Sequence, residues 1–130
     1  MAQVSALRWA VVLVDFEPGV VGHEQQGERR ALVVSYEAFH ASGLAAVCPI
    51  SSRLPKYLGE VPIPRGHAGQ TKDGVVLCHQ LRTIDQSRIT AWTLGGQPQY
   101  VTNPAIRQAV RLALQHHLGL DIPAEADGAA

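Results

Sequence analysis

Short apolar runs, separated by glycine, proline and polar residues, make up most of this chain. The run over residues 8–16 is rich in Val and Leu, which is typical of a buried β-strand. A Glu-Pro-Gly sequence then interrupts it. We expect residues 36–41 to form a short connection with about one helical turn, and residues 82–85 to lead away from the fifth predicted strand, residues 74–81. The further predicted strands are residues 31–35, 44–50, 59–63, 74–81 and 88–92.

One amphipathic helix is predicted near the C-terminus. Asn103 is a suitable N-cap, Pro104 suits the first helical position, and Gly119 supplies the stop. The apolar residues between them recur at helical spacing; they are Ile106, Val110, Ala113, Leu114 and Leu118. Several short strands and one terminal helix predict a mainly β fold with α structure, a small and partly open β-barrel with the helix packed on it.

Composition limits the class of protein. A chain of 130 residues that is 46% hydrophobic suits one compact domain, which we place at residues 1–120. Residues 121–130 read as a disordered acidic tail. No apolar run is long enough for a membrane span, and residues 1–8 lack the pattern of a signal peptide, so a cytoplasmic protein is expected. Cys48 and Cys78 lie in apolar runs and are expected to be reduced core residues.

Charge adds a mild preference for anionic partners. The formal net charge is zero, but without the last ten residues 11 basic residues stand against 8 acidic ones. Four of the basic residues fall between positions 53 and 72, and the only acidic residue in that stretch is Glu60. This distribution suits transient contact with a few phosphates better than tight binding of a duplex.

Candidate chemistry concentrates in residues 22–30, GHEQQGERR, which run directly into an apolar strand. The segment contains a histidine and a glutamate between two glycines, and a glutamate and two arginines after the second glycine. A titratable base, an acid and a fixed positive charge are the groups that a phosphoryl-transfer site needs. Loops held by rigid strands are also a frequent place for such sites.

The order of the segments resembles the MazF/PemK/Kid toxins of bacterial toxin–antitoxin modules. The matching pieces are VDFEP at 14–18, GHEQQGER at 22–29 with ALVVS at 31–35, CPISSR at 48–53, DGVVL at 73–77 and QLRTID at 80–85. The resemblance implies an SH3-like β-barrel of the CcdB/Kid/MazF kind with a C-terminal helix. It also implies metal-independent, sequence-specific cleavage of single-stranded RNA without a cofactor. The implied partners are a second copy of the chain, in a homodimer, and a cognate antitoxin whose extended tail occupies the RNA groove.

The resemblance also assigns candidate roles within that reaction. Arg29 aligns with an arginine of the family and would hold the charge of the phosphate, although a salt bridge to a loop carboxylate is the structural alternative. Glu24 and His23 are the acid and base candidates, or else braces of the loop. Ser51 would position the scissile phosphate or orient the base, although serine also caps strand ends. Contacts to RNA are expected from Ser52, Arg53, Arg30 and Arg82, with simple solvation the alternative for Arg30 and Arg53.

Two departures from the family pattern leave a second function open. His79 stands where the family usually has Asp, so it could pair with His23 in proton transfer, or it could be a buried, hydrogen-bonded histidine. The first strand reads Arg8-Trp9-Ala10 where the family usually has Arg-Gly followed by an acid. A catalytically weak member that only binds a protein, such as an antitoxin or a gyrase-like target, is therefore the alternative. The histidines and cysteines show no spacing typical of a zinc site, and no metal is expected.

Overall fold

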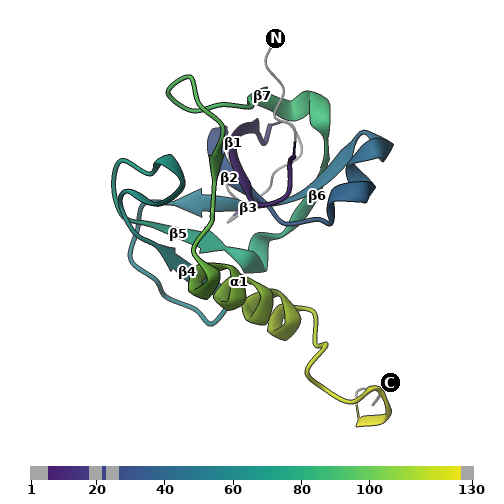
Figure 1. The fold of residues 1–130 in the computed structure, drawn as a ribbon. Helices are drawn as coiled ribbons and strands as arrows, with labels where there is room; N and C mark the ends of the chain where they lie inside the picture. The colour runs from purple at the N-terminus through teal and green to yellow at the C-terminus, as the bar shows by residue number, and fades with distance from the viewer. Residues whose placement is uncertain (1–5, 18–21, 23–26, 127–130) are drawn as a thin grey trace.

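The computed structural model describes residues 6–17, 22 and 27–126. It is a curled sheet of eight strands with one α-helix across it (Figure 1). The strands are β1 (Ala10–Asp15), β2 (Glu28–Val33), β3 (Leu44–Ser51), β4 (Glu60–Ile63), β5 (Gly74–Leu77), β6 (Arg82–Asp85), β7 (Ile89–Ala91) and β8 (Gln99–Tyr100). The helix is α1 (Pro104–His117), and the main 3₁₀ turns are η1 (Glu37–Ser42), η2 (His67–Gly69) and η3 (Cys78–Gln80).

The sheet follows the order β4-β5-β3-β2-β1-β7, and all pairs are antiparallel. β6 pairs with the first half of β3, β5 pairs with its end, and β8 pairs with the start of β1. No pairing joins β4 to β7 among the described residues, so the sheet curls without closing. The prediction of a mainly β fold, partly open and with a C-terminal helix, is confirmed.

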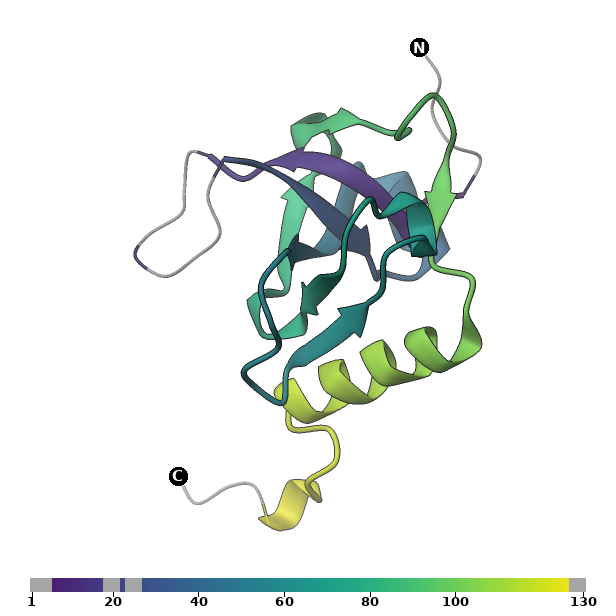
Figure 2. The ribbon, with the colours of Figure 1, turned by 90° about the vertical axis from the view of Figure 1, so that its left-hand side faces the viewer.

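Strand β1 is buried on both faces, which explains its unbroken apolar sequence. Val11 belongs to one core cluster, which α1 covers through Val110 and Ala113 (Figure 2). Val12 and Val14 on the opposite face belong to a second cluster with residues of β6 and β7. Because successive side chains of a strand alternate between its faces, a strand between two cores has no polar face to show.

The start of α1 is fixed as the sequence predicts. The side-chain oxygen of Asn103 accepts hydrogen bonds from the backbone N–H groups of Ala105 and Ile106, at 2.9 and 3.1 Å. Gly119, just beyond the helix, has a φ of +70°, a conformation that glycine adopts at little cost. The disorder expected for residues 121–130 remains a prediction. Residues 121–125 are exposed, and Ala124–Ala126 forms a short 3₁₀ turn.

Two predicted strand boundaries were wrong. β2 begins at Glu28 rather than at residue 31, because Glu28 and Arg29 pair with Asp15 and Val14 and so extend the hairpin. The fifth strand ends at Leu77 rather than at residue 81. There the backbone N–H groups of Cys78 and His79 both donate to the carbonyl of Gly59, and the chain turns through η3.

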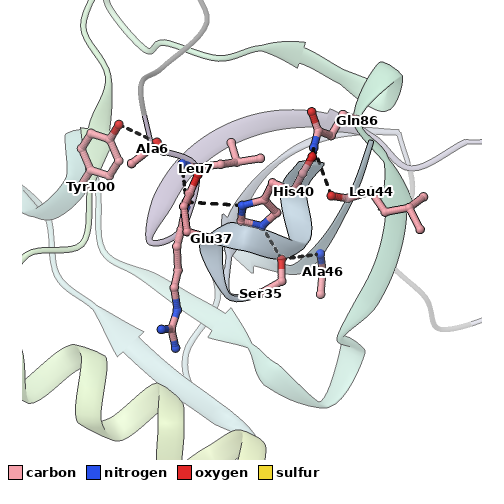
Figure 3. A network of polar contacts seen from close by, with 10 residues as sticks. Ala6, Leu7, Ser35, Glu37, His40, Leu44, Ala46, Gln86 and Tyr100 are labelled. Carbon is pink, nitrogen blue, oxygen red and sulfur yellow. Dashed lines mark hydrogen bonds and ion pairs between the residues drawn. The ribbon is translucent and has the colours of Figure 1, made fainter. Parts of the chain in front are cut away.

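Residues 82–85 were predicted to lead away from the fifth strand, but they form β6, which pairs with β3. The short connection predicted at residues 36–41 is confirmed as η1. A polar network holds it to the rest of the fold, as Figure 3 shows. The hydroxyl of Ser35 lies 2.6 Å from Nε2 of His40 and accepts a hydrogen bond from the backbone of Ala46, and the amide of Gln86 donates to the carbonyl of His40.

Cys48 and Cys78 are buried free thiols, which agrees with the prediction of reduced core residues. A hydrogen bond with the Cys78 thiol, together with burial, raises the pKa of the Cys48 thiol well above its usual value. Both thiols belong to the same core cluster as Val11.

Candidate active site

A surface pocket of about 320 Å³ opens where β2 begins and β3 ends. It contains three cationic side chains, those of Arg29, Arg30 and Lys72, against the single carboxylate of Glu28. The remaining lining residues are Leu13, Ile50, Ser51, Ser52, Gln70 and Thr71. Most of the wall is therefore polar, and its charge suits a phosphate group.

The two arginines reach this pocket from β2, and their surroundings differ. Arg29 is exposed and lies opposite Val14 in the hairpin. Arg30 is half-buried and donates from one terminal nitrogen to the carbonyl oxygen of Gly69, at 3.2 Å, and to the side-chain oxygen of Gln70, at 3.0 Å. Arg30 is thus not simply solvated: it fastens the segment after η2 to β2 and so shapes the pocket wall.

The two serines reach the pocket from the end of β3. Ser51 is half-buried and pairs with Val75 of β5, whereas Ser52, one residue beyond the strand, is exposed. Rigid pairing on one side and an open pocket on the other give Ser51 a fixed position with access to a ligand. The structure thus brings together four of the residues chosen from the sequence: Arg29, Arg30, Ser51 and Ser52.

The acid and base candidates of the loop, His23 and Glu24, lie outside the described residues. The carboxylate that the structure does place on the pocket is Glu28, which the sequence analysis did not single out. One of its oxygens accepts a hydrogen bond of 2.5 Å from the hydroxyl of Thr90. Glu28 directly precedes Arg29 in β2.

Arg53 and His79 are not part of this pocket but meet at a buried carboxylate, that of Glu60. Both nitrogens at the end of the Arg53 side chain donate to the two oxygens of Glu60, and Nε2 of His79 lies 2.8 Å from one of them. The Arg53 guanidinium thus forms an internal ion pair, and its expected contact with RNA remains a prediction. His79 is hydrogen-bonded, as one of the two alternatives expected, and its pairing with His23 remains a prediction because His23 lies outside the described residues.

Glu60 organises the whole segment that follows the serines. It is 7% exposed and accepts further hydrogen bonds from the backbone N–H groups of Lys56, at 2.6 Å, and Tyr57, at 3.3 Å. The hydrogen bonds from the Arg53 guanidinium hold the pKa of this carboxyl well below its usual range, and those from His79 and the backbone act in the same direction. An ionised Glu60 thus fixes residues 53–57, directly after Ser52.

Arg82, the remaining residue expected to contact RNA, lies on β6 and outside the pocket. It is half-buried, and its guanidinium donates to the carbonyl oxygen of Phe16, at 3.2 Å. It therefore supports the end of β1, where the hairpin begins. Within the part of the chain that the structure describes, no group of three His, Cys, Asp or Glu side chains could hold a metal ion. Nor does any helix there have the length and apolar character to cross a membrane.

Sequence reasoning missed the wall of the pocket formed by Gln70, Thr71 and Lys72. These residues follow η2 and lie some 40 positions after Arg30 in the chain. A hydrogen bond from the Arg30 guanidinium to the Gln70 side chain brings them to the pocket. The clustering of basic residues between 53 and 72 was the only sequence signal for this segment. Glu60 gave a weaker one, as a lone acid within that basic stretch.

Comparisons with known proteins agree with this arrangement. A family model of the PemK-like, MazF-like toxins of type II toxin–antitoxin systems matches residues 7–118. The endoribonuclease toxin ChpB of Escherichia coli (strain K12) is 36% identical over 102 residues, which cover 76% of this chain and 86% of that protein.

Solved structures give the same result. MazF (Form-I) from Deinococcus radiodurans is 34% identical, with a TM-score of 0.69, over 86% of this chain and 94% of that one. A MazE-MazF structure (Form-III) from the same organism matches at 29% identity, with a TM-score of 0.63, over 86% of this chain and 94% of that one. The chain therefore belongs to the PemK-like, MazF-like toxin family of type II toxin–antitoxin systems.

Proposed function

We propose that this chain is the toxin of a type II toxin–antitoxin module, a sequence-specific endoribonuclease that cleaves single-stranded RNA without a metal ion. The observation that carries the proposal is the pocket in which Arg29 and Lys72 lie beside Ser51 and Ser52. Family membership and the endoribonuclease activity named for ChpB support the same reaction. The site would work in the cytoplasm, where messenger RNA is translated.

RNA carries its own nucleophile, so this reaction needs no cofactor. A base removes the proton of a ribose 2′-hydroxyl, and that oxygen attacks the adjacent phosphorus. The bond from phosphorus to the 5′-oxygen of the next nucleotide breaks, and an acid protonates that oxygen. The products are a 2′,3′-cyclic phosphate and a free 5′-hydroxyl. Extra negative charge develops on the phosphate oxygens, and fixed cations stabilise it.

Each group of the pocket has a role in this scheme. Arg29 holds the non-bridging oxygens, because a guanidinium is always charged and binds two oxygens at once. Ser51 positions the phosphate from the end of a rigid strand, and Ser52 and Lys72 contact the neighbouring backbone. Glu24 and His23 remain the proposed groups for proton transfer. His79 takes no proton in this proposal, since it is bonded to Glu60 outside the pocket.

Two protein partners complete the proposal. The MazE-MazF structure of Deinococcus radiodurans supports a cognate antitoxin for this chain, which would cover the RNA-binding face. A second copy of the chain would form a homodimer. An apolar groove of about 390 Å³ between β4 and α1 supports the dimer, because Leu58 and Leu112 at its rim are 81% and 54% exposed.

The test is cleavage of a long, unstructured RNA by the purified protein, with and without EDTA, and with the cut sites mapped by primer extension. We expect cuts at one short sequence motif, equally strong in EDTA. Arg29→Ala should lower the rate by at least about a hundredfold, the size typical for loss of one transition-state contact. Arg65→Gln serves as the matched control, since Arg65 is exposed and outside the pocket.

Three outcomes contradict the proposal. Cleavage that EDTA abolishes would show that a metal ion is required. Arg29→Ala with wild-type activity and an intact fold would remove the pocket from the reaction. The absence of any cleavage at high protein concentration would favour the alternative, a member of the family that acts only by binding another protein.

A further inference from the structure

A second, larger pocket lies at the start of β1, where the first turns of α1 pass it. It measures about 500 Å³, and its lining contains three arginines and no acid. Among the described residues, no ion pair joins any of these arginines to a carboxylate. The pocket thus holds a concentrated positive charge that no ion pair within the described part of the chain balances. Its lining residues are Arg8, Trp9, Pro104, Arg107, Gln108 and Arg111.

Trp9 orders two of the three arginines. The guanidinium carbons of Arg8 and Arg107 lie 5.3 and 5.2 Å from the centre of its ring system. Stacking on an aromatic ring occupies the flat face of a guanidinium and leaves its N–H edge free to bind an anion. Arg107 also donates from Nε to the carbonyl oxygen of Val101, at 2.6 Å, and its two terminal nitrogens make no hydrogen bond to another described residue, so they can bind a ligand.

The backbone around Trp9 is held in a conformation that a bulky residue rarely adopts. Its φ is +70°, and it stands where the resemblance described above places glycine. Two backbone hydrogen bonds maintain it, from Trp9 to the carbonyl of Val33, at 2.8 Å, and from Val101 to the carbonyl of Trp9, at 2.9 Å. Strain of this kind concentrates at binding sites, where the surrounding structure enforces it.

Glu37 fixes the remaining edge of the pocket. One oxygen of its carboxylate accepts a hydrogen bond from the backbone N–H group of Leu7, at 2.9 Å (Figure 3), and another from that of Arg8, at 2.8 Å. This contact anchors to η1 the turn that contains Arg8. The Arg8 guanidinium itself lies over the ring of Trp9. Arg8 and Arg107 are therefore held in place before any ligand arrives.

The two pockets are close in the chain, one beside the turn that precedes β1 and the other beside β1 itself. Trp9 borders the arginine pocket and Leu13 borders the active-site pocket, and both pack against the same core cluster. Trp9 and Leu13 are four positions apart, so their Cα atoms lie at most about 14 Å from each other. A few nucleotides of single-stranded RNA span such a distance, so one strand can reach both pockets.

We infer that the pocket of Arg8, Trp9, Arg107 and Arg111 is a second phosphate subsite, which binds the RNA backbone at a distance from the bond that is cut. This inference rests on the proposed ribonuclease function. Guanidinium groups match the geometry of phosphate oxygens, and the short distance to the active-site pocket favours RNA over an acidic protein segment. The subsite reads no bases, because such contacts position a strand without specifying its sequence.

The test measures binding of a fluorescein-labelled, randomised, fully 2′-O-methylated strand of 20 nucleotides, which lacks the nucleophile and stays intact. Fluorescence anisotropy gives the affinity of the wild type and of Arg8→Gln/Arg111→Gln between 50 and 200 mM salt. Both side chains are exposed, and circular dichroism checks the fold. Each lost phosphate contact reduces the salt slope by about 0.7, so two contacts reduce the salt response by about sevenfold over this range. Arg65→Gln is the control and should keep the wild-type slope.

The outcomes separate this inference from the proposed function. A shallower slope in the double variant, with Arg65→Gln unchanged, supports the subsite whether or not the protein cleaves RNA. A wild-type slope in a folded double variant overturns the subsite, even if the wild type cleaves RNA. A double variant that binds the strand normally but loses binding of poly-glutamate would assign the pocket to an acidic protein partner and would also overturn the inference.

Discussion

Replacement of Glu60 by glutamine tests how the fold supports the segment after Ser52. Gln keeps the shape of the side chain but removes the charge that Arg53 and His79 meet. Hydrogen bonds to a charged group contribute roughly 1.5–3 kcal/mol, against about 1 kcal/mol for neutral ones. The Arg53 and His79 side chains are 30% and 25% exposed, so solvent screens part of the effect. We expect a loss of about 2 kcal/mol at neutral pH.

For a chain of 130 residues, a loss of this size lowers the melting temperature by about 7 °C. The sign of the pH dependence follows from the lowered pKa of Glu60. A carboxyl whose pKa is lower in the folded state stabilises the fold above its unfolded pKa, about 4.3, and loses that contribution as the pH falls. The gap in stability between the wild type and Glu60→Gln should therefore be full at pH 7 and clearly smaller at pH 3.

Urea unfolding followed by tryptophan fluorescence measures this gap at both pH values. Glu125→Gln is the matched control, because it makes the same chemical change at a residue that is exposed in the tail. Two results would refute the reasoning: a Glu60→Gln variant as stable as Glu125→Gln at pH 7, or a gap that stays constant down to pH 3. Either would mean that the ionised carboxylate does not stabilise the fold.

Three further predictions concern packing, capping and assembly. Gly59→Ala should cost about 1–3 kcal/mol, because its new Cβ would lie 2.9 Å from Cβ of His79; an unchanged urea midpoint would contradict this. Asn103→Ala removes the acceptor for two N–H groups of the first turn of α1 and should lower the free energy of unfolding by about 1 kcal/mol, while Asn103→Asp, which retains an acceptor, should restore most of it. Leu112→Glu should convert a dimer to a monomer in multi-angle light scattering, and a variant that stays dimeric would exclude this face as the interface.

The sequence predicted the elements whose signals are local. The cap at Asn103, the periodicity of α1 and the apolar runs of β1 and β3 all depend on residues near one another in the chain, and these predictions were confirmed. The start of β2 was missed because charged residues at 28–30 read as loop. Their pairing with β1 became visible only in the hairpin register.

Long-range contacts account for the remaining differences. The turn at residues 78–80 contains neither glycine nor proline, so the sequence predicted one strand over residues 74–81 where the fold has β5 and then η3. In the site, Arg29 and Ser51 were found through the family pattern, and the structure brings both to one pocket. The contact of Arg53 and His79 with Glu60 was not predicted, because Glu60 lies 7 residues from one and 19 from the other, and no local pattern connects the three.

The most direct test of the central proposal uses one RNA that contains the mapped cleavage motif, made in two forms. In one form all riboses are unmodified, and in the other only the ribose 5′ to the cut carries a 2′-O-methyl group. The account predicts that the wild type cuts the first form in EDTA, leaving a 2′,3′-cyclic phosphate and a 5′-hydroxyl, and leaves the second intact at that bond. Cleavage of the methylated bond, or products with a 5′-phosphate, would contradict it, because the attacking oxygen would then come from water or the enzyme.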